Sequence, residues 1–534
     1  MLGKMELKFW SSSSNIPYIN NLPIIFLSLS TIAFSFLLSS IIAKLTKKRP
    51  LPPGPWKLPI IGSLHHLIGE LPHRSLTRLS RKYGPLMHLQ LGEVPAIVVS
   101  SPEMAKAVTK THDLAFSNRP KLMALDLVFY KCTDIAFAPY GDYWREMRRI
   151  CILELLTAKM VKSFGSIRQD ELRNLVSSVT VSSSSSVVNL MREVMWFNSS
   201  MTCRAAFGRM KLSSRDQEEL IAKVTEVLTF AGGFHVADLF PSRKWIPYVC
   251  GSRSRLLTLH RGLDKIYESM IKEHEEKTCR SNGGGDRGTA PNEEEEDIVD
   301  VLLRVGQVGE HRLTRDNIKA VINDLFSAGS ETTATSATWA MSELIRNRRV
   351  MDKAQEEVRK TINGGKTAVT SFDDDEVEKL TYLKLVIRET LRLHPPIPLL
   401  LPRESSEETV IGGFTIPPKT RAIVNAWAIG RDPKVWEDPE TFWPERFMNE
   451  SGAAADVHGN HYELLPFGSG RRVCPGVRFG LVNVTHSLAA LLYHFDWELP
   501  PGVTIENFDM SETMGLKATR KKDLCLVARP YSHP

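Results

Sequence analysis

The chain has 534 residues, of which 42% are hydrophobic, and a net charge of +7. This length suffices for two to four ordinary domains or for one unusually large helical domain. The charge is mild for this size, and no long basic tract contains interleaved aromatic residues, so nucleic-acid binding is not supported. The seven cysteines are scattered and lack C-x-x-C spacing, which indicates a reducing compartment and neither a disulfide framework nor a zinc site.

The first fifty residues predict a membrane anchor. Residues 9–43 carry no charge, and the 22 residues at 22–43 are apolar enough to form a helix of about 33 Å, which spans one bilayer core. A cleaved secretory signal peptide would have a shorter apolar region that ends at a small-residue cleavage site. Four positive charges at residues 44–49 follow instead, so we expect a retained signal anchor with the C-terminal bulk in the cytosol.

The chain is therefore expected to have four parts. Residues 1–21 form a lumenal segment, residues 22–43 the transmembrane anchor, residues 44–55 a basic and proline-rich hinge, and residues 56–534 a single large domain. The prolines at 50–55 cannot continue a helix and indicate a stiff connector. Because the large domain is expected in the cytosol, its sequons, at Asn198, Asn449 and Asn483, are expected to carry no glycan.

The large domain is predicted to be mostly α with a small β region. Residues 86–91 and 96–99 have the pattern of a hairpin, and residues 410–416 have that of a second one. Two low-complexity stretches, at 182–186 and 281–296, are expected to be solvated connections within one domain.

A glycine-rich loop, Phe467-Gly468-Ser469-Gly470-Arg471-Arg472-Val473-Cys474-Pro475-Gly476, is the most informative segment. Its glycines permit tight backbone turns, and Pro475 favours the first position of a helix, so Cys474 is expected just before a helix N-terminus. Free backbone N–H groups and the helix dipole would stabilise a sulfur anion there. An isolated cysteine in such a turn is more often structural. The whole ten-residue pattern is far more specific.

A second segment, Ala328-Gly329-Ser330-Glu331-Thr332-Thr333, lies inside a helical pattern that runs from about Thr314 to Ile345. Glycine, serine and threonine are poor helix formers, so local propensity is overridden here, as often happens at functional sites. The small residues leave room for a ligand, and Glu331 with Thr332 could form a proton-delivery pair. Close packing of two helices through small residues explains this segment equally well on its own.

These two segments together resemble the cytochrome P450 family. The loop matches the haem-binding signature F-x-x-G-x-R-x-C-x-G, and residues 328–333 match the oxygen-activation motif A/G-G-x-D/E-T-T/S. The resemblance covers essentially residues 50–530 and is strongest to the plant microsomal branch. It implies haem b with Cys474 as the iron ligand, and a mostly α-helical catalytic domain that has a small β-rich region.

The resemblance also implies roles for further residues. Glu331 and Thr332 would be catalytic, and Ala328 would leave room for dioxygen. Trp144 and Arg148, which surface packing would explain equally well in isolation, lie four residues apart on one helix face, and this spacing suits hydrogen bonds to a propionate. Glu389, Arg392 and Arg446 would form a structural network. The implied haem-binding set is Trp144, Arg148, Arg403, Arg472, Phe467, Gly468, Gly476 and Ala328, with Arg119 as a weaker candidate.

The expected function is an NADPH- and O₂-dependent haem-thiolate monooxygenase of the endoplasmic reticulum membrane that hydroxylates or epoxidises a small apolar metabolite. The sequence contains no P-loop, dinucleotide-binding motif or flavin-sized extra domain. NADPH and flavins are therefore expected only in a partner, NADPH–cytochrome P450 reductase, with cytochrome b5 as an optional second donor. A basic docking face for the reductase is expected at Arg145, Arg149, Arg471 and Arg478.

The segments expected to line the substrate pocket are nearly all apolar, which favours a terpenoid or a similar specialised metabolite. They are Leu122, Leu125, Leu127, Val128 and Phe129, with residues 323–328, 397–401 and 513–516.

Two rival functions are possible for such a chain. One is a family member that rearranges peroxides or dehydrates its substrate without a reductase, and the other is a catalytically silent membrane scaffold. The presence of Glu331, Thr332 and Cys474 argues against both. Turnover that stops when NADPH is withheld separates the monooxygenase from the first rival.

Overall fold

The structure is a computed structural model. It describes residues 30–31, 50–183, 187–208, 213–283, 297–308, 313–363, 372–448, 456–513 and 515–532. The chain divides into two compact units, Met1–Pro50 and Leu51–Pro534. The predicted anchor lies outside the described residues, apart from Ser30 and Thr31. Among the helices that the structure describes, none combines the length and the apolar character needed to cross a membrane.

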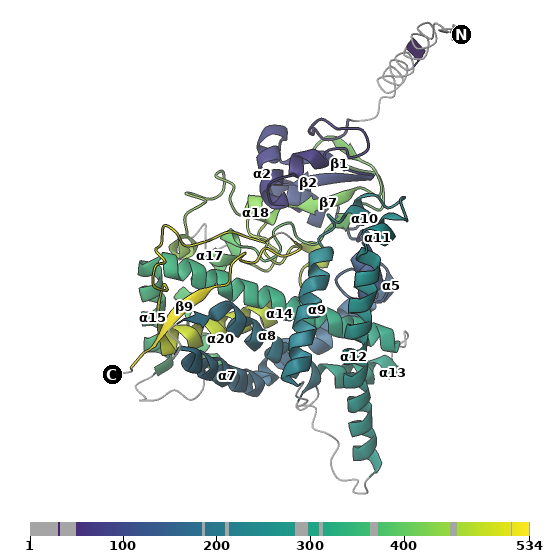
Figure 1. Cartoon of the computed structure of the whole chain (residues 1–534). Helices are drawn as coiled ribbons and strands as arrows, with labels where there is room; N and C mark the ends of the chain where they lie inside the picture. Colours follow the sequence, from purple (N-terminus) through teal and green to yellow (C-terminus); the bar gives the residue numbers. More distant parts are fainter. Residues whose placement is uncertain are drawn as a thin grey trace, which may run out of the picture. The chain divides into compact units, whose positions relative to one another are not determined.

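Helices make up most of the second unit, as predicted (Figure 1). Its longer helices are α2 (Pro72–Tyr83), α5 (Asp142–Ile150), α7 (Gly165–Ser183), α8 (Leu190–Phe207), α9 (Ser214–Phe230), α12 (Ser252–Gly283), α13 (Ile298–Val308), α14 (Arg315–Arg346), α15 (Arg348–Asn363), α17 (Thr381–Leu393) and α20 (Val477–His494). Shorter helices are α3 (Pro102–Lys106), α4 (Met123–Val128), α6 (Ala158–Ser163), α10 (Val236–Leu239), α11 (Ile246–Val249), α16 (Asp374–Val377) and α18 (Ala426–Ile429). Single π or 3-10 turns occur at Leu64–Leu67, Ala107–Thr111, Cys151–Leu155, Pro444–Met448 and Gly470–Arg472.

The β region is small. A four-stranded sheet has the order β1-β2-β7-β4, with β1 at Leu86–Leu91, β2 at Val94–Val99, β7 at Arg421–Val424 and β4 at Arg403–Glu404. A second sheet has the order β3-β9-β8, with bounds Val188–Asn189, Cys525–Pro530 and Phe495–Glu498, and β5 (Thr409–Ile411) pairs with β6 (Phe414–Ile416). Both predicted hairpins are confirmed, because β1 pairs antiparallel with β2 and β5 with β6.

Helix α14 crosses the middle of the helical part and packs against α8, α17 and α20 (Figure 1). It begins after Thr314, whose side chain forms a capping box with Asn317. Most of its hydroxyl side chains donate a hydrogen bond to a backbone carbonyl of the same helix, whereas Ser330 Oγ is buried without a partner among the described residues. Thr338 Oγ1 donates to Ala334 O at 2.7 Å, and Ser342 Oγ donates to Thr338 O at 2.7 Å. A polar sequence can therefore form a buried helix here.

The predicted structural network of one glutamate and two arginines is confirmed. Arg392 donates to both carboxylate oxygens of Glu389 at 2.7 Å, and Arg446 Nε donates to Oε1 of Glu389 at 3.1 Å. Glu389 and Arg392 are fully buried. Arg392 also donates to the carbonyl of Gly430 at 2.6 Å, so the network ties α17 to the segment that follows β7.

Two predicted boundaries differ from the structure. Ser182 and Ser183 belong to the end of α7, and residues 281–283 to the end of α12; the rest of both low-complexity stretches lies outside the described residues. Residues 53 and 54 of the predicted hinge pack against β1. His88 N donates to Pro53 O at 2.9 Å, and a Cβ on Gly54 would come within 2.0 Å of His88 O.

We expect Glu389→Gln to destabilise the protein strongly, because it leaves two buried guanidinium groups without their anion. The free energy of unfolding should fall by about 3–5 kcal/mol, measured by denaturant unfolding. The exposed pair of Glu498 and Arg529 provides a control, and Glu498→Gln should cost at most about 1 kcal/mol. Equal effects of the two substitutions would contradict this account of the network.

Candidate active site

A cavity in the second unit lies between α14 and the loop that precedes α20. Ala328, Gly329, Thr332 and Thr333 of α14 line it, and so does Cys474 of the loop. The cavity brings together every predicted haem-binding residue, namely Trp144, Arg148, Arg403, Arg472, Phe467, Gly468, Gly476 and Ala328, together with Thr332 and Cys474. Glu331 is the one predicted site residue that is not part of this lining.

The loop around Cys474 owes its shape to glycine. Gly468 and Gly470 both have φ of +71°, which side chains rarely adopt. A Cβ on Gly470 would also come within 1.9 Å of Thr109 O, so no other residue fits. Cys474 N donates to Phe467 O at 3.0 Å and closes the loop. The thiol is consequently held at one place beside the cavity.

The start of α20 differs from the prediction. The helix begins at Val477 with Gly476 as its N-cap, so Pro475 lies in the preceding turn and Cys474 stands further from the helix than expected. Burial raises the pKa of the Cys474 thiol, although the N–H of Gly476 and the charge of Arg148 oppose this shift. A metal ion would displace the thiol proton, because a thiolate is the ligand form of cysteine.

Four guanidinium groups crowd one edge of the cavity, those of Arg119, Arg148, Arg403 and Arg472. Burial and the charges of Arg403 and Arg148 lower the pKa of Arg472 to about 9, and burial with Arg472 and Arg403 lowers that of Arg119. The like charges therefore repel one another in a poorly solvated place. An anionic group bound beside them would relieve this repulsion.

These arginines also cross-link the loops around the cavity. Arg119 donates to Ala136 O at 2.9 Å and to Leu401 O at 2.7 Å. Arg472 donates to Ser117 O at 2.8 Å and to Ala138 O at 2.7 Å. Further bonds run from Arg403 to Ser469 O at 2.7 Å and to Asp113 at 3.1 Å, and from Arg148 to Val473 O at 2.6 Å.

Trp144 contacts the arginine cluster through its ring, whereas its N–H group was predicted to bind a propionate. Its Nε1–H donates to Ile135 O at 2.9 Å, so that donor already has a partner. The guanidinium of Arg472 lies 4.1 Å from the centre of the indole ring. Trp144 therefore positions Arg472 through a cation–π contact.

The α14 side of the cavity explains the small-residue motif. Thr332 Oγ1 donates to Ala328 O at 2.6 Å, and both residues line the cavity. A Cβ on Gly329 would lie 3.3 Å from Thr202 Oγ1 of α8, so this glycine also allows close helix packing. Close helix packing is therefore confirmed for Gly329, and the proton-delivery role stays a prediction.

Glu331 points away from the cavity lining. Its carboxylate accepts a hydrogen bond from Thr225 of α9 and forms an ion pair with Lys517. Consecutive residues of an α-helix project about 100° apart, so Glu331 and Thr332 face different neighbours. The predicted catalytic pair is thus split between a buried ion pair and the cavity wall.

The predicted pocket segment 323–328 brings a carboxylate into the cavity wall, to which sequence reasoning assigned no role. Asp324 of α14 lines the cavity and accepts from Ile135 N at 2.7 Å and Ala136 N at 3.0 Å. Burial raises the pKa of Asp324 to about 6, and burial together with the Asp324 charge raises that of Asp134. An acidic residue on an apolar helix face was the available signal.

The predicted substrate segments are only partly found at the cavity. Leu325, Ile397, Leu400 and Leu401 line it. Residues 513 and 515–516 line a smaller neighbouring cavity, and Met514 lies outside the described residues. The side chains of Leu122, Leu125 and Val128 belong to the hydrophobic core, because α4 packs against α9 and α12.

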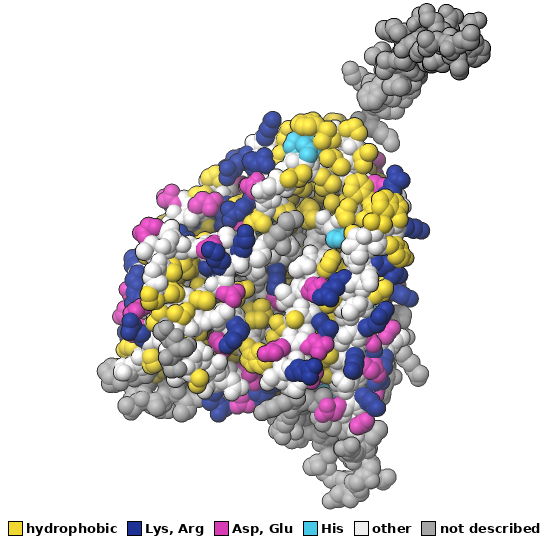
Figure 2. All heavy atoms as spheres, viewed as in Figure 1, with side chains coloured by type: hydrophobic (Ala, Val, Ile, Leu, Met, Phe, Trp, Pro, Cys, Tyr) yellow, Lys and Arg dark blue, Asp and Glu magenta, His cyan; other side chains and the backbone are white. Residues whose placement is uncertain are grey.

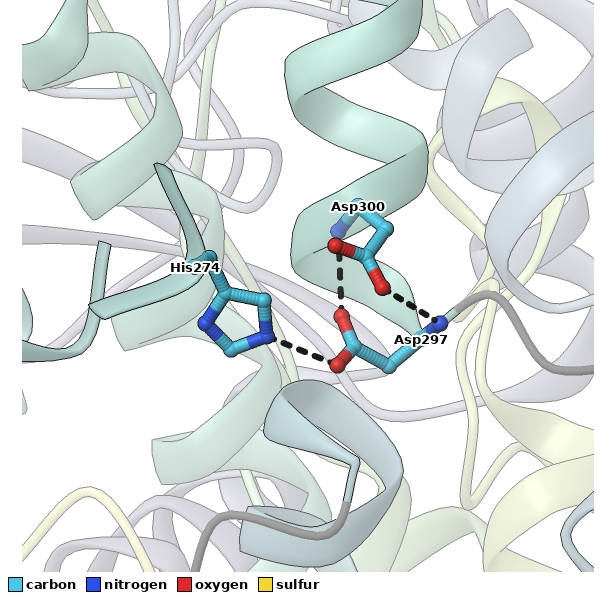
Figure 3. A group of neighbouring side chains, drawn as sticks. All are labelled: His274, Asp297 and Asp300. Carbon is cyan, nitrogen blue, oxygen red and sulfur yellow. Dashed lines mark hydrogen bonds and ion pairs between the residues drawn. The ribbon is translucent and has the colours of Figure 1, made fainter. Parts of the chain in front are cut away.

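A second titratable cluster lies apart from the cavity lining and consists of His274, Asp297 and Asp300 (Figure 3). Asp297 Oδ1 accepts from Val299 N and Asp300 N at 3.0 Å, which caps the start of α13. His274 Nδ1 contacts Met270 O at 3.0 Å, and Nε2 lies 2.7 Å from Asp297 Oδ2. Both ring nitrogens are therefore occupied, and the cluster is explained as a helix cap with a buried ion pair.

The sequence model of the cytochrome P450 family matches residues 52–526. The chain therefore belongs to the cytochrome P450 family, as its motifs predicted. It is an oxidoreductase of the monooxygenase type. Membership implies a haem cofactor, a redox partner and a small substrate with O₂. The cavity fits haem, because its lining holds the Cys474 thiol in the signature loop, the small residues of α14 and a cationic edge for two carboxylates. Cys151 is a second thiol in the same lining, outside that loop.

Plant monooxygenases are among the relatives of this chain. Premnaspirodiene oxygenase of Hyoscyamus muticus is 52% identical, over 95% of this chain and 97% of that enzyme. The 5-epiaristolochene 1,3-dihydroxylase of Nicotiana tabacum is 50% identical, over 95% and 97%. Amorpha-4,11-diene 12-monooxygenase of Artemisia annua is 47% identical, over 91% and 93%. A zebrafish cytochrome P450 solved with abiraterone shares the fold, with a TM-score of 0.69, 24% identity and coverage of 86% and 99%.

The ion pair of His274 with Asp297 predicts a pH-dependent stability. Burial alone would lower the pKa of His274, but the hydrogen bond and charge of Asp297 outweigh it and raise the pKa. The stabilisation is therefore complete below the unfolded value of about 6.5 and is lost as the pH rises through the higher folded value. We expect His274→Gln to cost about 1.5–3 kcal/mol at pH 6 and much less at pH 9, measured by denaturant unfolding. The exposed His458 provides a control, and a pH-independent cost for His274→Gln would contradict the ion pair.

Proposed function

We propose that the chain is an NADPH- and O₂-dependent haem-thiolate monooxygenase that hydroxylates or epoxidises a terpenoid. One observation carries the proposal: Cys474 and Thr332 line the same cavity, and a cluster of arginines belongs to the same lining. When bound, haem b supplies the iron chemistry of O₂ reduction and oxygen insertion, and a thiolate ligand favours O–O cleavage.

The residues of this chain would hold haem in three ways. Cys474 would ligate the iron as the thiolate, in the loop that Phe467, Gly468 and Gly476 shape. Arg148, Arg403 and Arg472, with Arg119, would pair with the two propionates. Trp144 would fix Arg472 through its ring, and its Nε1–H would reach a propionate only if it left Ile135 O.

On the other side, α14 would control protons and space. Ala328 leaves room beside Thr332, whose hydroxyl would hold and pass a proton into the cavity. Glu331 would supply protons to Thr332 from the buried side of the helix. Its carboxylate would first have to leave the ion pair with Lys517.

The substrate is proposed to be apolar and of terpenoid type. Leu325, Leu391, Ile397, Leu401 and Phe479 give the cavity a mostly hydrophobic wall. The relatives are named for oxidising premnaspirodiene, 5-epiaristolochene and amorpha-4,11-diene. These compounds are the first to test, by their haem spectral shifts on binding and by mass spectrometry of products made with a reductase and NADPH.

Electrons are proposed to come from NADPH–cytochrome P450 reductase, with cytochrome b5 as an optional second donor. The expected docking arginines are exposed, but several are already paired. Arg145 pairs with Asp142 and Arg149 with Glu146 on the same helix, and Arg471 lies 3.4 Å from Asp113. These pairs reduce the free positive charge of the face, so we expect a weaker salt dependence of docking than four free arginines would give.

The chain is proposed to be a single-pass protein of the endoplasmic reticulum membrane with a cytosolic catalytic domain. A second feature supports membrane contact besides the proposed anchor: apolar side chains gather over β1, β2, α10 and α11 (Figure 2). The α10–α11 segment is joined to the β1–β2 turn, since Glu93 N donates to Leu239 O at 2.8 Å. We define the apolar face by its exposed residues, which are Trp56, Ile60, Ile68, Trp245, Tyr248 and Val249.

Cys474→Ser should abolish the thiolate-type spectrum of the reduced carbon-monoxide complex and all turnover, because a serine hydroxyl is a poor iron ligand. The matched control is Cys151→Ser, a buried cysteine that also lines the cavity. The control should keep its spectrum. A thiolate-type spectrum in the Cys474 variant would remove this residue as the ligand.

The apolar face should bind lipid without the anchor. We expect the unit at 51–534 to float with phospholipid vesicles, and Ile60→Glu with Val249→Glu to weaken that binding at least tenfold, because each apolar side chain loses about 1.5–3 kcal/mol of burial. Leu153, an exposed residue outside this face, is the control position for a glutamate. Unchanged flotation of the double variant would exclude lipid contact by this face.

A further inference from the structure

Glu331 is a buried carboxylate held by two segments far from it in sequence. Its side chain is 2% exposed and that of its ion-pair partner Lys517 is 14% exposed. Thr225 of α9 donates the second contact to the same carboxylate. Both partners therefore approach Glu331 from outside α14, on the side away from the cavity lining.

Hydrogen bonds hold the backbone on either side of Lys517. Thr513 N donates to Thr519 O at 2.8 Å, which joins the backbone on the two sides of Lys517. Ala518 N donates to Pro396 O at 2.9 Å, and Trp339 Nε1 of α14 donates to Ala518 O at 2.9 Å. The backbone next to Lys517 is thus tied to the helix that carries Glu331.

The charge of Lys517 determines whether the buried carboxylate of Glu331 stays ionised. A buried carboxylate without a partner takes up a proton, because burial disfavours its charged form. Burial lowers the pKa of the Lys517 ammonium to about 8, so the group still carries its charge at neutral pH. Lys517 also lines the small cavity bounded by Leu400, Gly232 and Leu516, next to the main one.

We infer that Lys517 is a positioning residue for Glu331. It keeps the carboxylate turned away from the cavity and ionised, so that Glu331 can accept a proton from water and pass it on when it turns to Thr332. The inference rests on the proposed function, in which Glu331 supplies protons to Thr332. A purely structural ion pair would affect stability alone. Replacing a positioning residue would also change the fraction of NADPH electrons that is used to form product.

The test uses the full haem-loaded chain with a reductase and measures product formed per NADPH consumed. Lys517→Met should lower this ratio about tenfold and raise the peroxide formed, because proton delivery to Thr332 is impaired. Lys517→Arg should restore the ratio to within about twofold of the wild type, because it keeps the charge. Lys521→Met, at an exposed lysine of the same segment, should change nothing.

A second measurement follows Glu331 itself without turnover. Infrared difference spectra of the resting protein, Lys517→Met against Lys517→Met/Glu331→Gln, should show the C=O band of a protonated carboxyl group. The same comparison of the wild type with Glu331→Gln should lack this band. A Lys517→Met variant without the band would overturn the inference.

The double variant Lys517→Met/Glu331→Gln buries no unpaired charge. It therefore keeps the test informative even if Lys517→Met alone folds poorly. It should have the same product ratio as Glu331→Gln alone, because Lys517 acts through Glu331. A lower ratio in the double variant, or an arginine variant as impaired as the methionine one, would also overturn the inference. A wild-type chain without a thiolate-type carbon-monoxide spectrum would instead refute the proposed function, so the two failures are distinguishable.

Discussion

Guanidinium groups bound to backbone carbonyls organise the site. Arg119 joins the loop at Ala136 to Leu401, Arg472 joins Ser117 and Ala138 to the cysteine loop, and Arg403 reaches Ser469. These bonds draw together segments that lie far apart in the chain. They also concentrate positive charge where little water reaches it, and this excess charge suits the two carboxylates of haem. In the proposed function, cofactor binding and loop closure would depend on the same side chains.

The different faces of helix α14 contact different parts of the structure. Thr332 and Ala328 face the cavity, Gly329 admits α8, and Glu331 faces α9 and the segment that carries Lys517. A six-residue motif can serve all these neighbours because consecutive helical residues point in different directions. The cost in helix propensity is offset by burial and by hydroxyl groups that bond within the helix.

The sequence was informative where the signal is local. The β1–β2 hairpin, the start of α14 at Thr314 and the cavity position of Cys474 each follow from a short pattern, and the structure has them. The partners of Glu331 could not be predicted, because Thr225 and Lys517 reach it only after distant segments pack together. For the same reason Leu122 and Leu125, which look like pocket residues, are core residues. The helix after Cys474 begins later than expected because Pro475 and Gly476 form a turn.

The contact of Pro53 with His88 has a practical consequence for work with shortened chains. The carbonyl of Pro53 accepts the backbone N–H of His88, and Gly54 fits against the same strand with no room for a side chain. The end of the proline-rich stretch thus lies along β1 and provides a backbone acceptor for it. A shortened chain that starts beyond residue 55 would leave that N–H of β1 without its acceptor, whereas one that starts at Leu51 would keep the strand covered.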